Sequence, residues 1–462
     1  MKNRHNFAFL TAAVLCAFLL FGCEILPVSE QQAGSGDAAV LAEPAEDSFP
    51  AFPLEEDYAD QGGFMSDAYS KAWEEWFRFR NERRFQPAGY TDSLGCFVRA
   101  SVEKLLSDSK GGNGVVSPIN LYFAFSMLAE VTEGETREQI LKMIGAEDLQ
   151  QVEKSVPALY AANAQADGVS DCRMSQALWL RNGTAYRKEI LPVLAETYRA
   201  SVYSGEMGSD SYDKLLREWL NSGTGGLLQD SVSSVSLSKD TALALTAAIY
   251  YRAKWSDPFM PSRTESDLFD TPDGKVEADF MHDDRIMTLY TADKFKAVGL
   301  EMDSDGILYL LLPNDGGTPE DLLGDPEALS FLSGEAGSWP ERAECKVHLT
   351  VPKFDVISDM NLIPILEQLG ATDVSDPERA DFSGILSDGD AYLSDAKHAA
   401  RLKIDEEGCE AAAYTLLAAN DTGVFMELEE IDFTVDRPFL FALCGTDSAP
   451  LFIGLVNDPS ES

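Results

Sequence analysis

The segment KIDEEGCEAAAYTLLAANDTGVFMELEEIDFTVDRPF, residues 403–439, places a long run of small side chains between an acidic stretch and an apolar strand. The run from Gly408 to Ala419 has no proline and no helix cap, and its side chains sort by the two-residue period of a strand. One face carries Cys409, Ala411, Ala413, Thr415, Leu417 and Ala419. The other carries the charge of Glu410 and the ring of Tyr414. The run therefore predicts a strand whose small, mostly apolar face can slide over a packed core.

The N-terminus, MKNRHNFAFLTAAVLCAFLLFGC, has the organisation of a secretory signal. A basic start precedes an apolar run from Phe7 to Phe21 that is too short for a comfortable transmembrane helix. The closing LFGC resembles a bacterial lipobox, in which cleavage before Cys23 exposes that cysteine for diacylglycerol attachment. We expect a lipoprotein signal peptide over residues 1–22 and a mature protein anchored by lipid at the cell surface or envelope, in the extracellular space. The alternative is an ordinary signal peptide with an incidental cysteine.

The segment that follows is acidic and rich in proline, glycine, alanine and serine. Residues 24–63 contain ten acids and no lysine or arginine, which is typical of a disordered, self-repelling chain. We expect an acidic disordered tether over residues 23–63 and a helical extension over residues 64–90, where Trp73 and Trp76 have helical spacing. The globular domain is expected over residues 91–459.

The chain is strongly acidic, with 78 Asp and Glu against 36 Lys and Arg and a formal net charge of −42. Removing residues 1–22 takes away Lys2 and Arg4 and no acid, so the net charge becomes −44. Such a surface repels nucleic acids and anionic membranes. It favours encounter with basic partners, many proteases among them.

We find no sequence pattern of a metal, cofactor or catalytic site. Beyond Cys23 there are five cysteines, an odd number without CxxC spacing, and the four histidines stand far apart without HExxH. No GxSxG sequence occurs. We therefore expect no metal, no cofactor, no disulfide framework and no enzymatic activity.

Hydrophobic periodicity predicts helices mainly early in the chain and strands later. Helical spacing covers residues 92–106, 121–131, 135–145 and 360–370. Ser117 before Pro118 is typical of a helix start. Strand-like runs cover residues 172–180, 241–253, 307–313, 346–354 and 450–456. Because helices and strands do not alternate regularly, the expected class is α+β with large, mostly antiparallel sheets.

Several segments, in this order, are similar to those of the serpin family. The motifs are NGVVSPINLYFAFSMLAEVTEGETREQILKMIG (113–145), LTAAIYYRAKWSDPF (245–259), LTVPKFDV (349–356), LEQLGATDVSDPERADFSGI (366–385), AYLSDAKHAARLKIDEEGCEAAA (391–413) and DRPFLFALCGTDSAPLFIGLVNDP (436–459). They run from about Asp92 to Pro459 with the family's order and spacing. On these motifs the chain is identified as a member of the serpin family.

The resemblance implies three β-sheets, eight or nine helices and an exposed reactive loop, here over about residues 406–435. It also implies a suicide inhibitor, whose loop a target protease attacks as a substrate. After the acyl bond forms, the N-terminal part of the loop inserts into the main sheet as a new central strand, and the tethered protease is distorted. The implied partner is a serine protease, or a cysteine protease, in a covalent complex. The inhibitor is expected to be a monomer that binds no nucleic acid and reaches the membrane only through its lipid.

The start of the loop matches the hinge of inhibitory members of the family. The matching residues are Glu406, Glu407, Gly408, Cys409, Glu410, Ala411, Ala412 and Ala413. Cys409 stands where the family more often has Thr, Ser or Val, and Tyr414 departs from the small-residue pattern on the outward face. The hinge indicates an inhibitor. The alternative is a non-inhibitory serpin that acts as a membrane-tethered binding or chaperone-like module.

The predicted position of the attacked bond differs according to whether residues are counted forward from the hinge or back from Pro438. The usual spacing from the hinge places it at Thr422–Gly423, whereas counting back from Pro438 falls about five residues later, so Phe425 and Met426 are rivals. We favour Thr422, because the hinge side must insert and is therefore more rigidly spaced. A small residue suits an elastase-like or subtilisin-like protease, and Phe or Met suits a chymotrypsin-like one. No Lys or Arg lies between residues 403 and 437, so a trypsin-like target is not expected.

The resemblance also singles out residues beneath the place where the main sheet opens. Ser117, Asn120 and His398 match polar positions that hydrogen-bond strands which must part and close again. Trp255 matches a tryptophan at the top of the sheet, where the hinge first enters. Ala247 stands where the family usually has an asparagine, which predicts a thinner polar network here.

Overall fold

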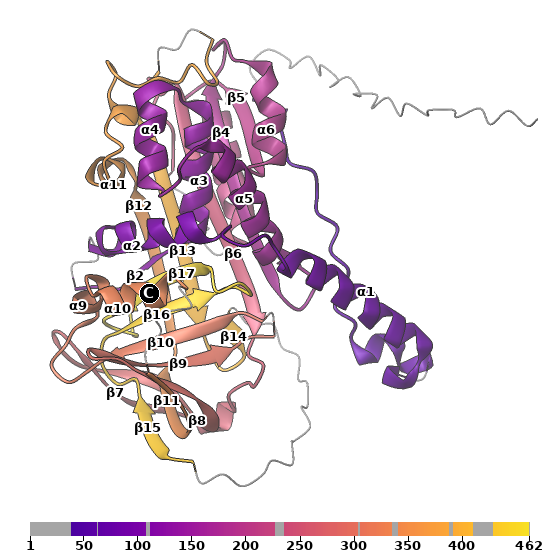
Figure 1. Cartoon of the computed structure of the whole chain (residues 1–462), viewed down its shortest axis with the longest axis vertical. Helices are drawn as coiled ribbons and strands as arrows, with labels where there is room; N and C mark the ends of the chain where they lie inside the picture. The colour runs from indigo at the N-terminus through magenta and orange to yellow at the C-terminus, as the bar shows by residue number, and fades with distance from the viewer. Residues whose placement is uncertain are drawn as a thin grey trace, which may run out of the picture. The chain divides into compact units, whose positions relative to one another are not determined.

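A serine followed by a proline starts the helix at the centre of the fold. In the computed structural model, Ser117 caps α3 (Pro118–Val131): its hydroxyl accepts a hydrogen bond from the Asn120 amide, and Pro118 occupies the first turn, where its missing N–H costs nothing. Every residue of α3 is buried. A helix that is apolar on all sides belongs in a core, and α3 contacts strands of both large sheets (Figure 1).

The structure describes residues 38–61, 63–107, 111–226, 235–303, 305–334, 341–387, 391–409 and 428–461. The α-helices are α1 (Asp67–Arg84), α2 (Asp92–Leu106), α3, α4 (Gly134–Met143), α5 (Leu149–Asn163), α6 (Leu191–Glu196), α7 (Asp210–Gly223), α9 (Pro319–Leu323), α10 (Pro326–Leu332) and α11 (Ile363–Gln368). The strands are β1 (Ala39–Ala42), β2 (Gly114–Val116), β3 (Gln165–Ala166), β4 (Asp171–Arg181), β5 (Ala200–Gly205), β6 (Leu243–Lys254), β7 (Thr264–Thr271), β8 (Gly274–Thr291), β9 (Phe295–Glu301), β10 (Ile307–Pro313), β11 (Glu341–Pro352), β12 (Phe354–Asn361), β13 (Asp395–Ile404), β14 (Gly408–Cys409), β15 (Glu430–Thr434), β16 (Phe439–Cys444) and β17 (Pro450–Val456).

The main sheet has the strand order β1-β5-β4-β6-β14-β13-β12, with β3 also paired to β4. Its two faces belong to separate cores. The larger core includes α2, α3 and α5, and the smaller packs α7 against Trp179 and Ala244. Strands covered on both faces read as nearly continuous apolar runs, which is why β6 is buried at ten of its twelve positions.

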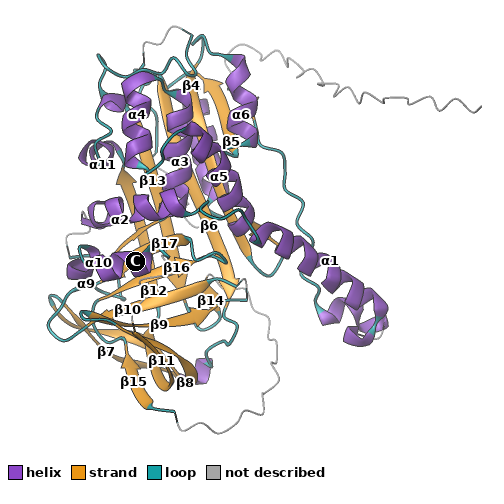
Figure 2. Cartoon of the chain, viewed as in Figure 1, coloured by secondary structure: helices purple, strands orange, loops and turns teal. Residues whose placement is uncertain are grey.

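The second sheet has the order β15-β11-β8-β9-β10-β16-β17-β2, with β7 paired to β8 (Figure 2). The 18-residue β8 pairs with β7 over its first half and with β9 at its last three residues. This long strand joins the expected second and third sheets into one ladder. The described residues hold ten α-helices, nine without α1, and most strand pairs are antiparallel. The expected α+β class is confirmed.

The described part of the expected tether departs from the prediction of disorder. Strand β1 pairs antiparallel with β5, which would otherwise be the edge strand of the main sheet. The Phe52 amide donates to the carbonyl of Asp167 (2.8 Å), and the ring of Phe52 packs edge-on against Trp73. Composition predicted disorder, but an open sheet edge offers backbone partners that composition does not reveal. Residues 23–37 lie outside the described part of the chain.

Helix α1 lies within the segment expected as a helical extension. Ser66 caps it through the Tyr69 amide. Trp76 is buried and donates its indole N–H to Asp167 (3.1 Å), and Arg80 pairs with Asp305 (2.9 Å). The extension is therefore attached to the domain by polar as well as aromatic contacts.

The predicted helix over residues 360–370 is wrong at its start. Met360 and Asn361 pair with His398 and Lys397 as the last residues of β12, and α11 begins only at Ile363. A neighbouring strand overrides the local helical spacing there. The predicted helix over residues 92–106 coincides with α2.

Candidate functional site

The hinge of the predicted reactive loop already forms a short strand in the main sheet. Strand β14 lies between β6 and β13, at the end of the main sheet nearest the second sheet (Figure 1). Gly408 is opposite Lys254, and Cys409 is opposite Ala253 on one side and Ile404 on the other. Both pairings are antiparallel.

Gly408 is required at the start of β14 for two reasons. Its φ is +151°, which L side chains rarely adopt. A Cβ at this position would also overlap the carbonyl oxygen of Ala253 and the Cα of Lys254. Only a glycine lets the chain approach β6 closely enough to pair.

The two glutamates before Gly408 hold the hinge in place. The Phe259 amide donates to the Glu406 carbonyl, and the Trp255 amide donates to the Glu407 carbonyl, both at 3.0 Å. The Glu406 carboxylate accepts from the Thr264 hydroxyl (2.8 Å) and pairs with Lys353 (3.3 Å). Partial burial opposes ionisation of Glu406, but these hydrogen bonds and Lys353 outweigh it, so its pKa is lowered.

Cys409 behaves as a small core residue. Its side chain is buried in the larger core, with its sulfur 3.8 Å from the carbonyl oxygen of Tyr251. Because side chains alternate along a strand, odd-numbered residues after Cys409 would face the same core if the strand continued.

Strands β6 and β13 contact each other directly only at one end. Residues Ala244–Ala247 of β6 pair in parallel with residues Asp395–His398 of β13. At the other end of the two strands, β14 lies between them. Among the described strands, none occupies the space between residues 248–252 of β6 and 399–403 of β13. The two strands therefore diverge above a short paired base.

The predicted polar cluster lies at that base. The ring Nε2 of His398 accepts from the Ser117 amide (3.1 Å), and the Asn120 side-chain oxygen accepts from Gln176 of β4 (2.8 Å). His398 is fully buried, and burial lowers its pKa to about 4. Ser117 and Asn120, at the start of α3, are thus brought together with His398 of β13, and Asn120 is also joined to β4 through Gln176.

Some hydrogen-bonding atoms of the cluster have no partner within the described chain. Nδ1 of His398 and the side-chain nitrogen of Asn120 have no hydrogen-bond partner there. His398 stands directly opposite Ala247, which is the position where the family usually has asparagine. The sequence analysis did not single out Gln176, whose only signal is a polar side chain in the mostly apolar run MSQALWL.

Trp255 closes the other end of the opening. Its ring is buried, and its indole N–H donates to the carbonyl of Asp405 (2.8 Å), just before the hinge. Trp255 also bridges to Met302 beside β9. The residue expected at the entry of the hinge therefore contacts the hinge itself.

Other predicted site residues lie outside the described residues. They are Glu410, Ala411, Ala412, Ala413, Thr422, Gly423, Phe425, Met426 and Cys23. In the part of the chain that is described, no three His, Cys, Asp or Glu side chains are placed to hold a metal ion. No described helix is long and apolar enough to cross a membrane, and no disulfide bond joins any two of the five described cysteines.

Comparison with known proteins gives consistent matches. A family model described as "Serpin (serine protease inhibitor)" matches residues 97–459. Putative serpin-Z6C of Oryza sativa subsp. japonica is 27% identical, over 76% of this chain and 91% of its own length. Alpha-1-antiproteinase of Mus saxicola is 28% identical, over 80% and 89%. The solved structure of a thermophilic serpin, tengpin, in the native state superposes with a TM-score of 0.71 at 20% identity, over 81% and 95%.

Proposed function

Because the chain belongs to the serpin family, we propose that it is an inhibitor that traps a serine protease through the insertion of its cleaved reactive loop. Attack on the loop would form an ester bond between the protease serine and the carbonyl carbon of the cleaved peptide bond, and would release the amine of the next residue. The loop segment before the cut, with the protease attached to its new C-terminal end, would enter the main sheet between β6 and β13. The protein is then a consumed substrate and not a catalyst.

The observation that carries the proposal is the arrangement of β14 between two diverging strands. β6 and β13 are parallel to each other, and β14 is antiparallel to both. Extending β14 replaces one parallel contact with two antiparallel ladders, which are slightly more stable per residue. It also gives ladder partners to backbone groups that the open strands leave without one.

The register of β14 accounts for the length of the small-residue run. Continued from the observed pairs, the strand would bring Ala419 opposite Leu243, the first residue of β6. The run Gly408–Ala419 has the same length as the 12-residue β6. The run is therefore as long as the space it has to fill.

The same register connects the loop to the polar cluster. Thr415 would lie between Ala247 and His398, on the core face that Cys409 occupies. Its hydroxyl would reach the side of the sheet where Nδ1 of His398 lacks a partner. Insertion would thus complete a cluster that is incomplete before cleavage.

The loop sequence suggests the class of protease. We propose attack at Thr422–Gly423 by an elastase-like or subtilisin-like enzyme, with a chymotrypsin-like enzyme at Phe425 or Met426 as the alternative. A trypsin-like enzyme is not proposed, since no Lys or Arg lies between residues 403 and 437.

Incubation with elastase, subtilisin, chymotrypsin and trypsin tests the mechanism. We expect an SDS-resistant complex with one of the first three and none with trypsin, at the summed mass less that of the C-terminal peptide that cleavage releases. Mass spectrometry of the released C-terminal peptide identifies the bond, and the cleaved protein should have a higher Tm than the intact one. Cleavage without a complex and without a rise in Tm would point to the non-inhibitory binding or chaperone-like module instead.

We also propose that the inhibitor acts outside the cytoplasmic membrane, held there by lipid on Cys23. The LFGC sequence supports this. Cys23→Ser should move the protein from the detergent-soluble membrane fraction to the aqueous fraction, and equal partitioning of both forms would exclude the anchor.

A further inference from the structure

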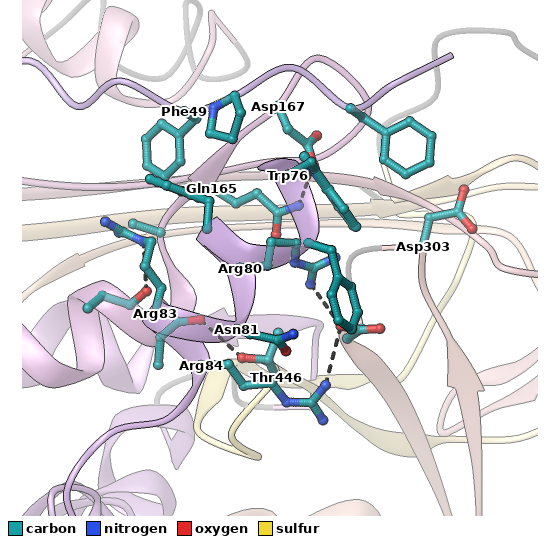
Figure 3. A pocket seen from close by; sticks show the side chains of 18 of the residues that line it. Phe49, Trp76, Arg80, Asn81, Arg83, Arg84, Gln165, Asp167, Asp303 and Thr446 are labelled. Atoms are coloured by element: carbon teal, nitrogen blue, oxygen red, sulfur yellow. Dashed lines mark hydrogen bonds and ion pairs between the residues drawn. The ribbon is translucent and has the colours of Figure 1, made fainter. Parts of the chain in front are cut away.

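A cavity of about 290 Å³ lies between the N-terminal extension and the domain (Figure 3). Aromatic side chains make up part of its lining: Phe49, Phe52, Trp73, Trp76, Phe77 and Phe79. Polar groups make up much of the rest, and Arg80, Arg83 and Arg84 of α1 are among them. A concave site that combines apolar walls with a few charged groups is the usual form of a small-molecule site.

Arg83 places a positive charge at this cavity with which no described acid pairs. Its Nε donates to the Ala161 carbonyl (3.0 Å), and its guanidinium lies over the rings of Phe49 and Phe79, at 5.0 and 5.4 Å from their centres. Its Nη2 is buried and has no hydrogen-bond partner in the described chain. Burial lowers the pKa of Arg83, because a charged guanidinium is disfavoured where water is excluded.

Asp47 is the acid that attracts Arg83 most, but it is already engaged. Its carboxylate pairs with Arg199 (2.9 Å) and accepts from the Tyr160 hydroxyl. Repulsion from Arg199 also opposes the attraction that Asp47 exerts on Arg83. Nε of Arg199 is likewise buried without a partner in the described chain. Two guanidinium groups therefore share one carboxylate beside the cavity.

The other two arginines of the cavity meet at Asp305. Arg80 and Arg84 both pair with it, at 2.9 and 3.6 Å, as the dashed lines in Figure 3 show. One carboxylate balances one of these two positive charges, so Asp305 leaves no negative charge to offset Arg83.

Two further acids, Asp167 and Asp303, line the cavity, and neither pairs with Arg83. Asp167 accepts hydrogen bonds from neutral donors alone, which are the side chains of Trp76 and Gln165 and the amides of Val169 and Ser170. Asp303 lies on the opposite side of the view from Arg83 (Figure 3). Burial raises the pKa of Asp303, and Lys254 attracts its carboxylate. The positive and negative ends of the cavity are therefore separate.

We propose that this cavity binds a small organic carboxylate, with its charge toward Arg83 and its apolar body against the aromatic side chains of α1. A carboxylate accepts charge-assisted hydrogen bonds from a guanidinium group, and these are stronger than neutral ones. It would give Nη2 of Arg83 the partner that it lacks. The net charge of −42 does not prevent this, because salt screens exposed charges beyond about 8 Å at physiological ionic strength. The site is separate from the hinge and does not rest on protease inhibition.

Calorimetric titration of the purified full-length protein with phenylacetate tests the proposal. Phenylacetamide is the matched neutral probe, acetate carries the charge without the ring, and phenethylammonium carries the opposite charge. We expect phenylacetate to bind at least about ten-fold more tightly than any of the other three. Arg83→Gln should weaken phenylacetate binding by a similar factor and leave phenylacetamide binding unchanged. Asp303→Asn should bind phenylacetate no more weakly than the wild type, because it removes a negative charge from the cavity.

The control variant is Arg78→Gln, because Arg78 is an exposed arginine of the same helix that does not line the cavity. It should bind phenylacetate as the wild type does, and the Tm of each variant shows that it is folded. If Arg83→Gln does not fold, the comparison of probes on the wild type decides by itself. Equal binding of phenylacetate and phenylacetamide would overturn the proposal, as would preferred binding of phenethylammonium. Unchanged phenylacetate binding in folded Arg83→Gln, or no binding of any probe to the wild type, would also overturn it.

Discussion

His398 couples the base of the sheet opening to pH. Burial lowers its pKa to about 4 in the folded protein, against an ordinary value of about 6.5 in an unfolded chain. Between about pH 6.5 and pH 4, His398 is therefore protonated in the unfolded chain but stays neutral in the folded protein. The stability that depends on a neutral His398 is complete above pH 6.5 and falls by about 1.4 kcal/mol per pH unit toward pH 4.

We expect the Tm of the uncleaved protein, measured by calorimetry, to fall between pH 6.5 and 5, and to fall less in His398→Gln. The control is His282→Gln, which removes a partly exposed histidine that contacts Thr350 and should keep the wild-type response. An identical pH response in the wild type and His398→Gln would show that other groups govern acid sensitivity.

At the scale of the element, β14 fixes which face of the loop must be small. Cys409 faces the larger core, so Ala413 would face it too after insertion, while Ala412 would face outward. Ala413→Glu should convert the inhibitor into a substrate, because it buries a charge in the advancing strand. The measurement is the number of inhibitor molecules consumed per protease trapped, which we expect to rise several-fold.

Ala412→Glu is the matched control for that prediction, since it adds the same charge on the opposite face. It should change the stoichiometry much less than Ala413→Glu does. Equal effects of the two variants would contradict the register continued from β14.

Helix α1 offers a second comparison between neighbouring residues. Trp76 is 6% exposed and hydrogen-bonds Asp167, whereas Phe77 beside it is 58% exposed. Trp76→Ala should lower the stability of the uncleaved protein by about 3 kcal/mol, through the cavity that the indole leaves and the loss of its hydrogen bond to Asp167. Phe77→Ala should change it by no more than about 0.5 kcal/mol. Urea denaturation compares the two, and similar losses would mean that α1 is not held by its buried face.

At the scale of the whole molecule, the net charge of −42 governs encounter with the protease. Attraction over long distances raises the association rate and is screened by salt. For a basic target protease we expect the second-order rate of complex formation to drop about ten-fold between low and high ionic strength. An acidic protease of the same specificity is the control, and its rate should not drop. A salt-independent rate with the basic protease would mean that the charge serves solubility alone.

Local sequence determined the features that depend on near neighbours. The Ser117–Pro118 helix start, the period of α2, the apolar run of β6 and the small-residue parity after Gly408 are each set by a few adjacent residues. The family motifs added the hinge and the polar positions at Ser117, Asn120 and His398, because those motifs keep their order and spacing along the chain.

Only the tertiary structure decided how distant segments meet. Gln176 joins the polar cluster, β14 pairs with β6 and β13, and β1 completes the edge of the main sheet. The cavity of about 290 Å³, lined by Trp76 of α1 and by Asp303, lies where α1 packs against a turn more than 200 residues away in the chain (Figure 3). Composition and periodicity describe what a segment prefers by itself, whereas backbone pairing and burial depend on which partner the fold brings to it.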